Sequence, residues 1–143
     1  MDSNLKRSII LEHYQHPHNR GLIEDSEYQK TNMNNESCID ELNIMVKIKD
    51  DIIEDMAFTG HGCAISQAST SIMIDTLKGK TIEEAKEIIK TFISMIKREE
   101  VNEDDLEKLE DAIAFKNVSN MPARVKCALL AWHTLDDMIS LKK

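Results

Sequence analysis

Three cysteines and one aspartate, spread over most of the chain, place the strongest constraint on its fold. Cys38, Asp40, Cys63 and Cys127 are the candidate ligands for a soft metal. Three thiolates and a carboxylate complete a tetrahedral shell for Zn²⁺, or anchor an iron–sulfur cluster. The chain contains no Cys-x-x-Cys pair, so the spacing is not that of a zinc finger. If the four side chains form one site, tertiary structure has to bring them together.

An alternative reading treats the cysteines as three unrelated buried thiols, since free cysteine often fills a core position as a small hydrophobe. Two local features favour metal ligands over core thiols. Gly62 directly precedes Cys63, and a polar run over residues 34–37 precedes Cys38. The odd number of cysteines also leaves one thiol unpaired in any disulfide scheme.

Length, charge and hydropathy narrow the class of protein. The chain has 143 residues, of which 41% are hydrophobic, and this predicts a single domain over residues 1–143 with its own core. A formal charge of −8 without a basic stripe argues against a nucleic-acid partner, since phosphate contacts need clustered Lys and Arg. No apolar run approaches the roughly 18 residues of a membrane span, and no apolar signal core begins the chain. We therefore expect no membrane partner and a cytoplasmic location, where reducing conditions disfavour disulfides.

Hydrophobic periodicity predicts a small sheet in the first half of the chain. Aliphatic residues alternate with mostly polar ones over residues 41–49, which indicates a half-buried strand. Asp50-Asp51 predicts a tight turn, after which residues 52–58 return as an antiparallel strand. A short edge strand is predicted near residues 28–33.

Helical patterns surround this sheet. The predicted helices cover about residues 3–15, 65–78, 82–97, 103–114 and 122–140. Thr81 and Glu84 have the spacing of a capping box, and Pro122 suits the first turn of the final helix. The fold class is therefore α+β: a small antiparallel β-sheet of about three strands, with an N-terminal helix and C-terminal helices packed on it.

Five motifs, taken together, resemble a known family. They are His13-Tyr14 through Pro17 to Asn19, Cys38-x-Asp40, Gly60-x-Gly62-Cys63 with Ile65-Ser66-x-Ala68-Ser69, Lys78-Gly79-Lys80, and Pro122-Ala123-Arg124-Val125-Lys126-Cys127-Ala128. The chain is similar to the U-type iron–sulfur cluster assembly proteins, and most closely to their SufU branch. The IscU-type scaffolds carry a histidine before the third cysteine, where this chain has Lys126. They also have a shorter interval between the second and third cysteines, which here is 127 − 63 = 64 positions.

The resemblance implies a ligand set and a reaction. It places the family's three cysteines and its aspartate on Cys38, Cys63, Cys127 and Asp40, as ligands of Zn²⁺ or, alternatively, of iron or a [2Fe–2S] cluster. It implies that Cys38 accepts sulfur from the persulfide of a cysteine desulfurase of the SufS type, with downstream iron–sulfur assembly proteins as further partners. Ile39 departs from the family, which usually has glycine there, and a β-branched residue disfavours positive φ.

Two other functions stay open on the same residues. One is a scaffold that assembles a [2Fe–2S] cluster and transfers it. The other is a zinc-stabilised adaptor that binds the desulfurase without carrying sulfur. Desulfurase turnover with Cys38→Ala separates the adaptor from the sulfur acceptor.

Some further polar residues are candidates for the site. Arg124 lies three residues before Cys127, on nearly the same face of the predicted helix. It is a candidate catalytic residue that would balance the negative charge of the ligands; the alternative is an ordinary surface ion pair. His61, two residues before Cys63, is expected to have a loop role, and it is the best reserve ligand.

The remaining histidines of the first half are expected to have structural roles. His16-x-His18 is expected in a solvated proline turn with no third ligand nearby. His13 and Tyr14 are expected to pack the first helix against the rest of the molecule.

Overall fold

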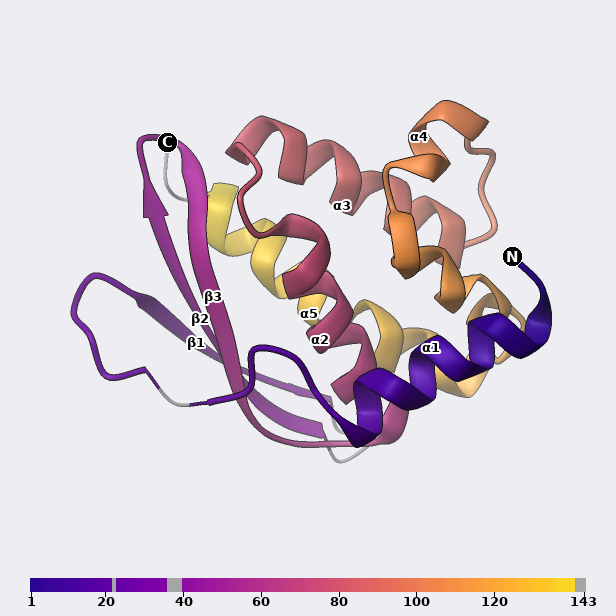
Figure 1. The fold of residues 1–143 in the computed structure, drawn as a ribbon, viewed down its shortest axis with the longest axis horizontal. Helices are drawn as coiled ribbons and strands as arrows, with labels where there is room; N and C mark the ends of the chain where they lie inside the picture. The colour runs from indigo at the N-terminus through magenta and orange to yellow at the C-terminus, as the bar shows by residue number, and fades with distance from the viewer. Residues whose placement is uncertain (22, 36–39, 141–143) are drawn as a thin grey trace.

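The computed structural model describes residues 1–21, 23–35 and 40–140 and has the predicted α+β architecture (Figure 1). Its elements are α1 (Ser3–Gln15), β1 (Gln29–Asn35), β2 (Asp40–Lys49), β3 (Ile52–His61), α2 (Ala64–Leu77), α3 (Ile82–Ile96), α4 (Glu103–Glu107), the 3₁₀ helix η1 (Glu110–Asn120) and α5 (Pro122–Ser140). Within these described ranges, none of the helices has the length and apolar character needed to span a bilayer.

The sheet has three antiparallel strands in the order β1-β2-β3, so the predicted edge strand and hairpin are confirmed. Lys49 of β2 pairs with Ile52 of β3 across the turn. The two turn residues, Asp50 and Asp51, have φ values of 53° and 60°. Positive φ at both central positions is the geometry whose twist matches that of the flanking strands, and aspartate tolerates it better than most residues. The acidic pair therefore suits the tight turn that joins β2 to β3, and the pairing register shifts once, between Lys47 and Ile48.

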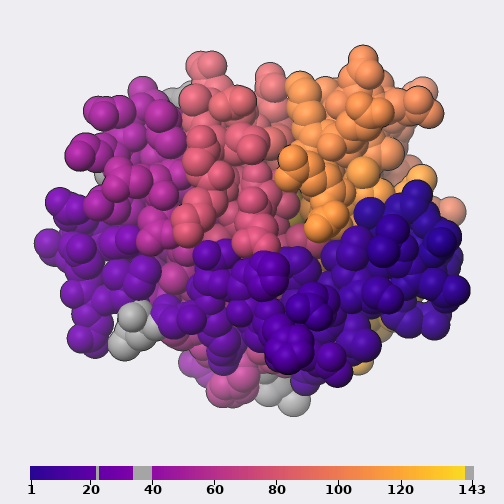
Figure 2. Space-filling model, viewed as in Figure 1, coloured from indigo at the N-terminus to yellow at the C-terminus, as the bar shows by residue number. Residues whose placement is uncertain are grey.

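The helices form a layer against one face of the sheet (Figure 1). The helices α2 and α5 contact the strands, while α1, α3 and η1 cover these two helices. Met73, Met95 and Met138 are buried between the elements, which confirms that they fill the core. The N-terminal helix lies on the surface of the molecule (Figure 2), and Tyr14 is 41% exposed there. The expectation that Tyr14 packs the helix is wrong, whereas His13 is buried as predicted.

A buried polar contact fixes α2 against α5. The hydroxyl of Ser69 donates to the carbonyl oxygen of Ala128 over 2.7 Å and accepts from Nε1 of Trp132 over 2.9 Å. The ring of Phe92, from α3, stacks on Trp132 with a centroid distance of 3.9 Å and an interplanar angle of 7°. Because all three side chains are fully buried, these contacts define the separation and rotation of the two helices.

Helix boundaries follow the predicted signals with one exception. Thr81 and Glu84 form the capping box, with both side-chain-to-amide bonds at 3.1 Å, and α5 begins at Pro122. The single helix predicted over residues 103–114 is wrong. α4 ends at Glu107 and a 3₁₀ helix begins at Glu110, whose φ of 50° interrupts the α-helical path.

The 3₁₀ geometry of η1 has a sequence basis. Leu109, Ala112, Phe115 and Val118 are all buried and recur every three residues. Side chains three apart eclipse one another in a 3₁₀ helix. This repeat therefore keeps one apolar stripe against the core, which a continuous α-helix would rotate away.

Candidate metal centre

Three of the four predicted ligands converge. Asp40, Cys63 and Cys127 each offer a ligand atom, and these atoms all lie within 4.8 Å of one another. They come from the first residue of β2, the N-cap of α2 and the second turn of α5. Cys38 and Ile39 lie outside the described residues. The described geometry therefore includes three of the four predicted ligands.

The carboxylate of Asp40 is buried, and among the described residues only its Oδ1 accepts hydrogen bonds. Its side chain is 2% exposed. Oδ1 accepts from the amide of Cys63 over 2.8 Å and from the hydroxyl of Ser66 over 2.9 Å. Oδ2 has no hydrogen-bond partner within the described part of the chain. A buried carboxylate oxygen without a partner is costly, and a bound cation would remove that cost.

The loop before α2 is shaped for close approach to this carboxylate. A β-carbon on Gly62 would lie 2.4 Å from Oδ1 of Asp40 and 2.6 Å from the hydroxyl oxygen of Ser66. Both distances are far below van der Waals contact, so only glycine fits. The amide side chain of Gln67 donates to the carbonyl oxygen of Gly62 over 2.7 Å and holds the loop from the helix side.

The two described cysteines occupy different environments. Cys63 is half-buried and caps α2, with its sulfur accepting from the amide of Ser66 over 3.5 Å. Cys127 is 1% exposed within α5. Two sulfurs and a carboxylate are a donor set that suits Zn²⁺, so the described residues fit the ion that the resemblance implies.

Ser66 contacts two of the predicted metal ligands, and these contacts were not predicted from the sequence. It lies three residues after the N-cap Cys63, and its hydroxyl and amide contact Asp40 and Cys63 respectively. The N-cap spacing was the available signal, since a cap side chain accepts from the amide two or three residues later. Arg20 is a second such residue. Its guanidinium lies over the ring of Phe58 and donates to the carbonyl oxygen of Gly60 and to the side-chain oxygen of Gln67, so it holds the loop together with Gln67.

The other predicted candidates lie outside the three-ligand cluster. Arg124 is exposed in the first turn of α5, one helical turn before Cys127. His61 is exposed at the end of β3 and does not belong to the cluster formed by the described ligands.

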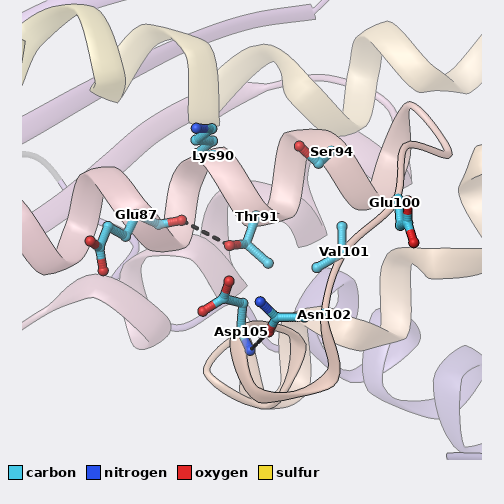
Figure 3. A pocket seen from close by; sticks show the side chains of 8 residues that line it. All are labelled: Glu87, Lys90, Thr91, Ser94, Glu100, Val101, Asn102 and Asp105. Carbon is cyan, nitrogen blue, oxygen red and sulfur yellow. Dashed lines mark hydrogen bonds between the residues drawn. The ribbon is translucent and has the colours of Figure 1, made fainter.

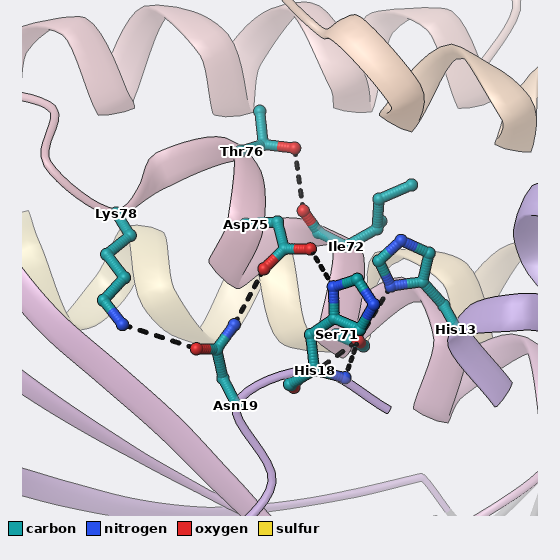
Figure 4. Close-up of polar contacts among 8 residues, drawn as sticks. All are labelled: His13, His18, Asn19, Ser71, Ile72, Asp75, Thr76 and Lys78. Carbon is teal, nitrogen blue, oxygen red and sulfur yellow. Dashed lines mark hydrogen bonds and ion pairs between the residues drawn. The ribbon is translucent and has the colours of Figure 1, made fainter. Parts of the chain in front are cut away.

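A second cluster lies where α1 meets α2 (Figure 4). His13, His18 and Asp75 offer ligand atoms within 4.8 Å of one another. Nδ1 of His18 pairs with Oδ2 of Asp75, and Nδ1 of His13 lies 2.8 Å from the hydroxyl oxygen of Ser71. The expectation that His18 has no third ligand nearby is therefore wrong, because the turn after α1 folds back against α2. Burial, and then the imidazole of His18, hold the pKa of His13 below its usual value.

An open pocket of about 330 Å³ lies beside α3 and α4 (Figure 3). Its polar groups bond locally: Thr91 donates to the carbonyl oxygen of Glu87 over 2.9 Å, and Asn102 accepts from the amide of Asp105 over 2.8 Å. Neither a thiol nor an imidazole is found in its described lining. This pocket therefore offers no soft-metal chemistry.

Comparisons with known proteins agree with this geometry. The model of the NifU-like N-terminal domain family matches residues 5–140. The chain is 42% identical over 132 residues to the zinc-dependent sulfurtransferase SufU of Bacillus subtilis, covering 92% of this chain and 87% of that one. It is 35% identical over 137 residues to the iron–sulfur cluster assembly scaffold protein IscU of Streptococcus pyogenes, covering 96% and 84%.

A solved structure gives the same result for the fold. A putative iron–sulfur cluster assembly scaffold protein for the SUF system from Fervidobacterium islandicum superimposes with a TM-score of 0.78 at 35% identity, over 96% of this chain and 98% of that one. The family match over residues 5–140 includes the parts of the chain that carry Asp40, Cys63 and Cys127. The chain belongs to the NifU-like N-terminal domain family, the U-type iron–sulfur cluster assembly proteins that include SufU and IscU.

Proposed function

We propose that this protein is a zinc-dependent sulfur acceptor in iron–sulfur cluster assembly. Its Cys38 would take sulfur from the persulfide of a cysteine desulfurase of the SufS type. The observation that supports this most is the convergence of two cysteine sulfurs on a buried carboxylate whose Oδ2 lacks a partner among the described residues. Similarity to a protein named as a zinc-dependent sulfurtransferase, over 92% of this chain, supports the same function.

In this proposal Cys38, Asp40, Cys63 and Cys127 hold the zinc. Zn²⁺, when bound, would keep the thiols ionised at neutral pH. The hydrogen bonds from Cys63 and Ser66 to Oδ1 keep the carboxylate in place. Asp40 would therefore be a fixed ligand, and Cys38 would be the ligand free to exchange for a donor from a partner protein.

The transfer itself is a thiol–disulfide type of exchange. The Cys38 thiolate attacks the outer sulfur of the desulfurase persulfide, and a sulfur–sulfur bond forms on Cys38 while the one on the desulfurase breaks. The desulfurase cysteine leaves as a thiolate, so charge and electrons balance without an added oxidant. Reduced thiols are required throughout, which places the reaction in the cytoplasm.

Arg124 is proposed to assist by charge. Three thiolates and a carboxylate exceed the charge of one zinc ion by two, and such an excess needs compensation. Arg124 lies one helical turn before Cys127 in α5, so its positive charge is placed to compensate this excess. Arg124→Gln should therefore weaken desulfurase stimulation, while Arg124→Lys should restore part of it; equal activity of the two variants would contradict a role for charge.

The central experiment is mass spectrometry after incubation with a desulfurase and cysteine. Wild type should gain the mass of one sulfur atom on Cys38, and desulfurase turnover should rise. Cys38→Ala should lose both effects, whereas His133→Gln, an exposed position on α5, should keep both. Stimulation that survives in folded Cys38→Ala would reject sulfur acceptance and favour the adaptor.

The scaffold is the second candidate, because a relative at 35% identity is named as one. It predicts that anaerobic purification yields a [2Fe–2S] cluster on the same cysteines, and that the cluster passes to an apo-ferredoxin. About one zinc per chain, with no transferable cluster, would reject the scaffold. The recipients in either case are downstream iron–sulfur assembly proteins.

A further inference from the structure

We propose that His13, His18 and Asp75 form a second binding site for a zinc-like divalent ion, separate from the thiol cluster and independent of the sulfur chemistry. The three side chains come from the last turn of α1, the turn that follows it, and α2. Two imidazoles and one carboxylate are a recurring zinc-binding set, with water in the fourth position.

The three ligand atoms lie close together. Ligand atoms about 2.0–2.1 Å from a zinc ion lie at most about 4.2 Å apart, and the three ligand atoms here lie within 4.8 Å of one another. Nδ1 of His18 and Oδ2 of Asp75 are in direct contact, so a bound ion would replace their hydrogen bond. The rings of His13 and His18 have centroids 4.4 Å apart (Figure 4). The side chains of His18 and Asp75 are 45% and 39% exposed, so an ion can reach them from solvent.

Surrounding residues orient these ligands. Asn19 donates to Oδ1 of Asp75 over 2.8 Å and accepts from Lys78 over 3.4 Å, which leaves Oδ2 directed toward His18 (Figure 4). Such outer contacts to a ligating carboxylate are usual in metal sites. When His13 turns to an ion, the Ser71 hydroxyl still accepts from the amide of His18 over 2.8 Å.

A bound ion would hold the turn after α1 against α2. The same turn pairs with β3 through the carbonyl oxygen of Asn19 and the amide of Gly21, which bond to Phe58 over 3.1 and 2.9 Å. The ion would thus tie α1 and the edge of the sheet to α2. The competing interpretation is a His18–Asp75 ion pair that only fixes the turn and binds no metal.

Titration of the reduced, tag-free full chain with Zn²⁺, followed by calorimetry, tests the proposal. Wild type should bind about two equivalents. His18→Gln and Asp75→Asn should each lose the second equivalent, or bind it at least tenfold more weakly. His16→Gln is the matched control, because His16 is an exposed histidine two residues away and outside the cluster; it should behave as wild type.

Cobalt separates this site from the thiol cluster. Co²⁺ bound by thiolates gives an intense sulfur-to-metal charge-transfer band that Co²⁺ on imidazole and carboxylate lacks. Folded His18→Gln should keep this band, and Cys63→Ser should weaken it while keeping the second equivalent. A second equivalent undiminished in both His18→Gln and Asp75→Asn, or absent from wild type, would overturn the second site. Failure of the thiol cluster would appear instead as a missing charge-transfer band.

Discussion

Nε1 of Trp132 donates to the hydroxyl of Ser69 over 2.9 Å in the fully buried contact between α5 and α2. These two helices carry Cys127 and Cys63. The contact between Ser69 and Trp132 is therefore a structural link between the fold and the ligand geometry, although neither residue touches the proposed metal.

Ser69→Ala should destabilise the protein and weaken zinc binding. The substitution leaves the indole N–H buried without an acceptor, which costs about 1–3 kcal/mol. Ser94→Ala is a matched control, because Ser94 is a half-buried serine on α3 that lines the open pocket; its effect should stay within about 0.5 kcal/mol. Urea unfolding with and without zinc measures both quantities. Equal stability of the two variants would contradict the assigned role of Ser69.

Gly62→Ala should reduce zinc affinity through a steric clash. The new methyl group would overlap Oδ1 of Asp40 and the hydroxyl of Ser66, so the carboxylate has to move. Gly79→Ala is an instructive contrast, because Gly79 has φ +87° and open space around its Cα. That variant should lose about 1–2 kcal/mol of stability from backbone strain while zinc affinity stays unchanged. A competitive chelator titration of both folded variants compares them.

Asp40→Asn should change stability in opposite directions with and without metal. The apo protein should become more stable, because a buried charge with an unpartnered oxygen is replaced by a neutral amide. The zinc affinity should fall at least about tenfold, or about 1.4 kcal/mol, because a charged ligand is lost. Unfolding in EDTA and in zinc measures each effect, with the exposed Asp137→Asn as control. Tighter zinc binding by Asp40→Asn would exclude the carboxylate as a ligand.

Tyr28 should make stability fall at high pH. Its hydrogen bond to Asp55, of 2.6 Å, and then burial raise the pKa of Tyr28 to about 12. In the unfolded chain, the phenol of Tyr28 loses its proton near pH 10. The folded state therefore holds this proton more tightly. The resulting stability is complete below pH 10 and is lost as the pH rises through 12.

Ultraviolet titration of the phenols and urea unfolding over the same pH range test this prediction. Tyr28→Phe should remove the late-titrating phenol and flatten the loss of stability. Tyr14→Phe, at an exposed position on α1, should change neither. An unaltered late titration in Tyr28→Phe would show that the hydrogen bond to Asp55 does not hold the proton.

Local sequence signals predicted much of the fold. Asp50-Asp51 predicted the hairpin between β2 and β3. Thr81 and Glu84 predicted the start of α3, and Pro122 predicted the start of α5. These features depend on neighbours within a few residues, so the sequence pattern contains them. The break at Glu110 was missed, because a positive φ at a glutamate is imposed by packing of the following apolar stripe rather than by local preference.

The two ligand clusters could also be predicted only in part. Asp40, Cys63 and Cys127 were singled out by chemistry and resemblance, and the structure places them together. The proximity of His18 to Asp75 could not be read from a separation of 57 positions. Nor could the orphaned Oδ2 of Asp40, since hydrogen-bond satisfaction is a property of the packed molecule.

The position of Cys127 in the last helix has a consequence for biosynthesis. A nascent chain presents Cys38, Asp40 and Cys63 while α5 is still within the ribosome, and three of the four proposed ligands would hold zinc less tightly than the full set. If the proposed zinc site is correct, stable loading with metal would wait until α5 has been translated and has docked beside Ser69. Zinc bound in a cell would then mark molecules in which α5 has folded into place.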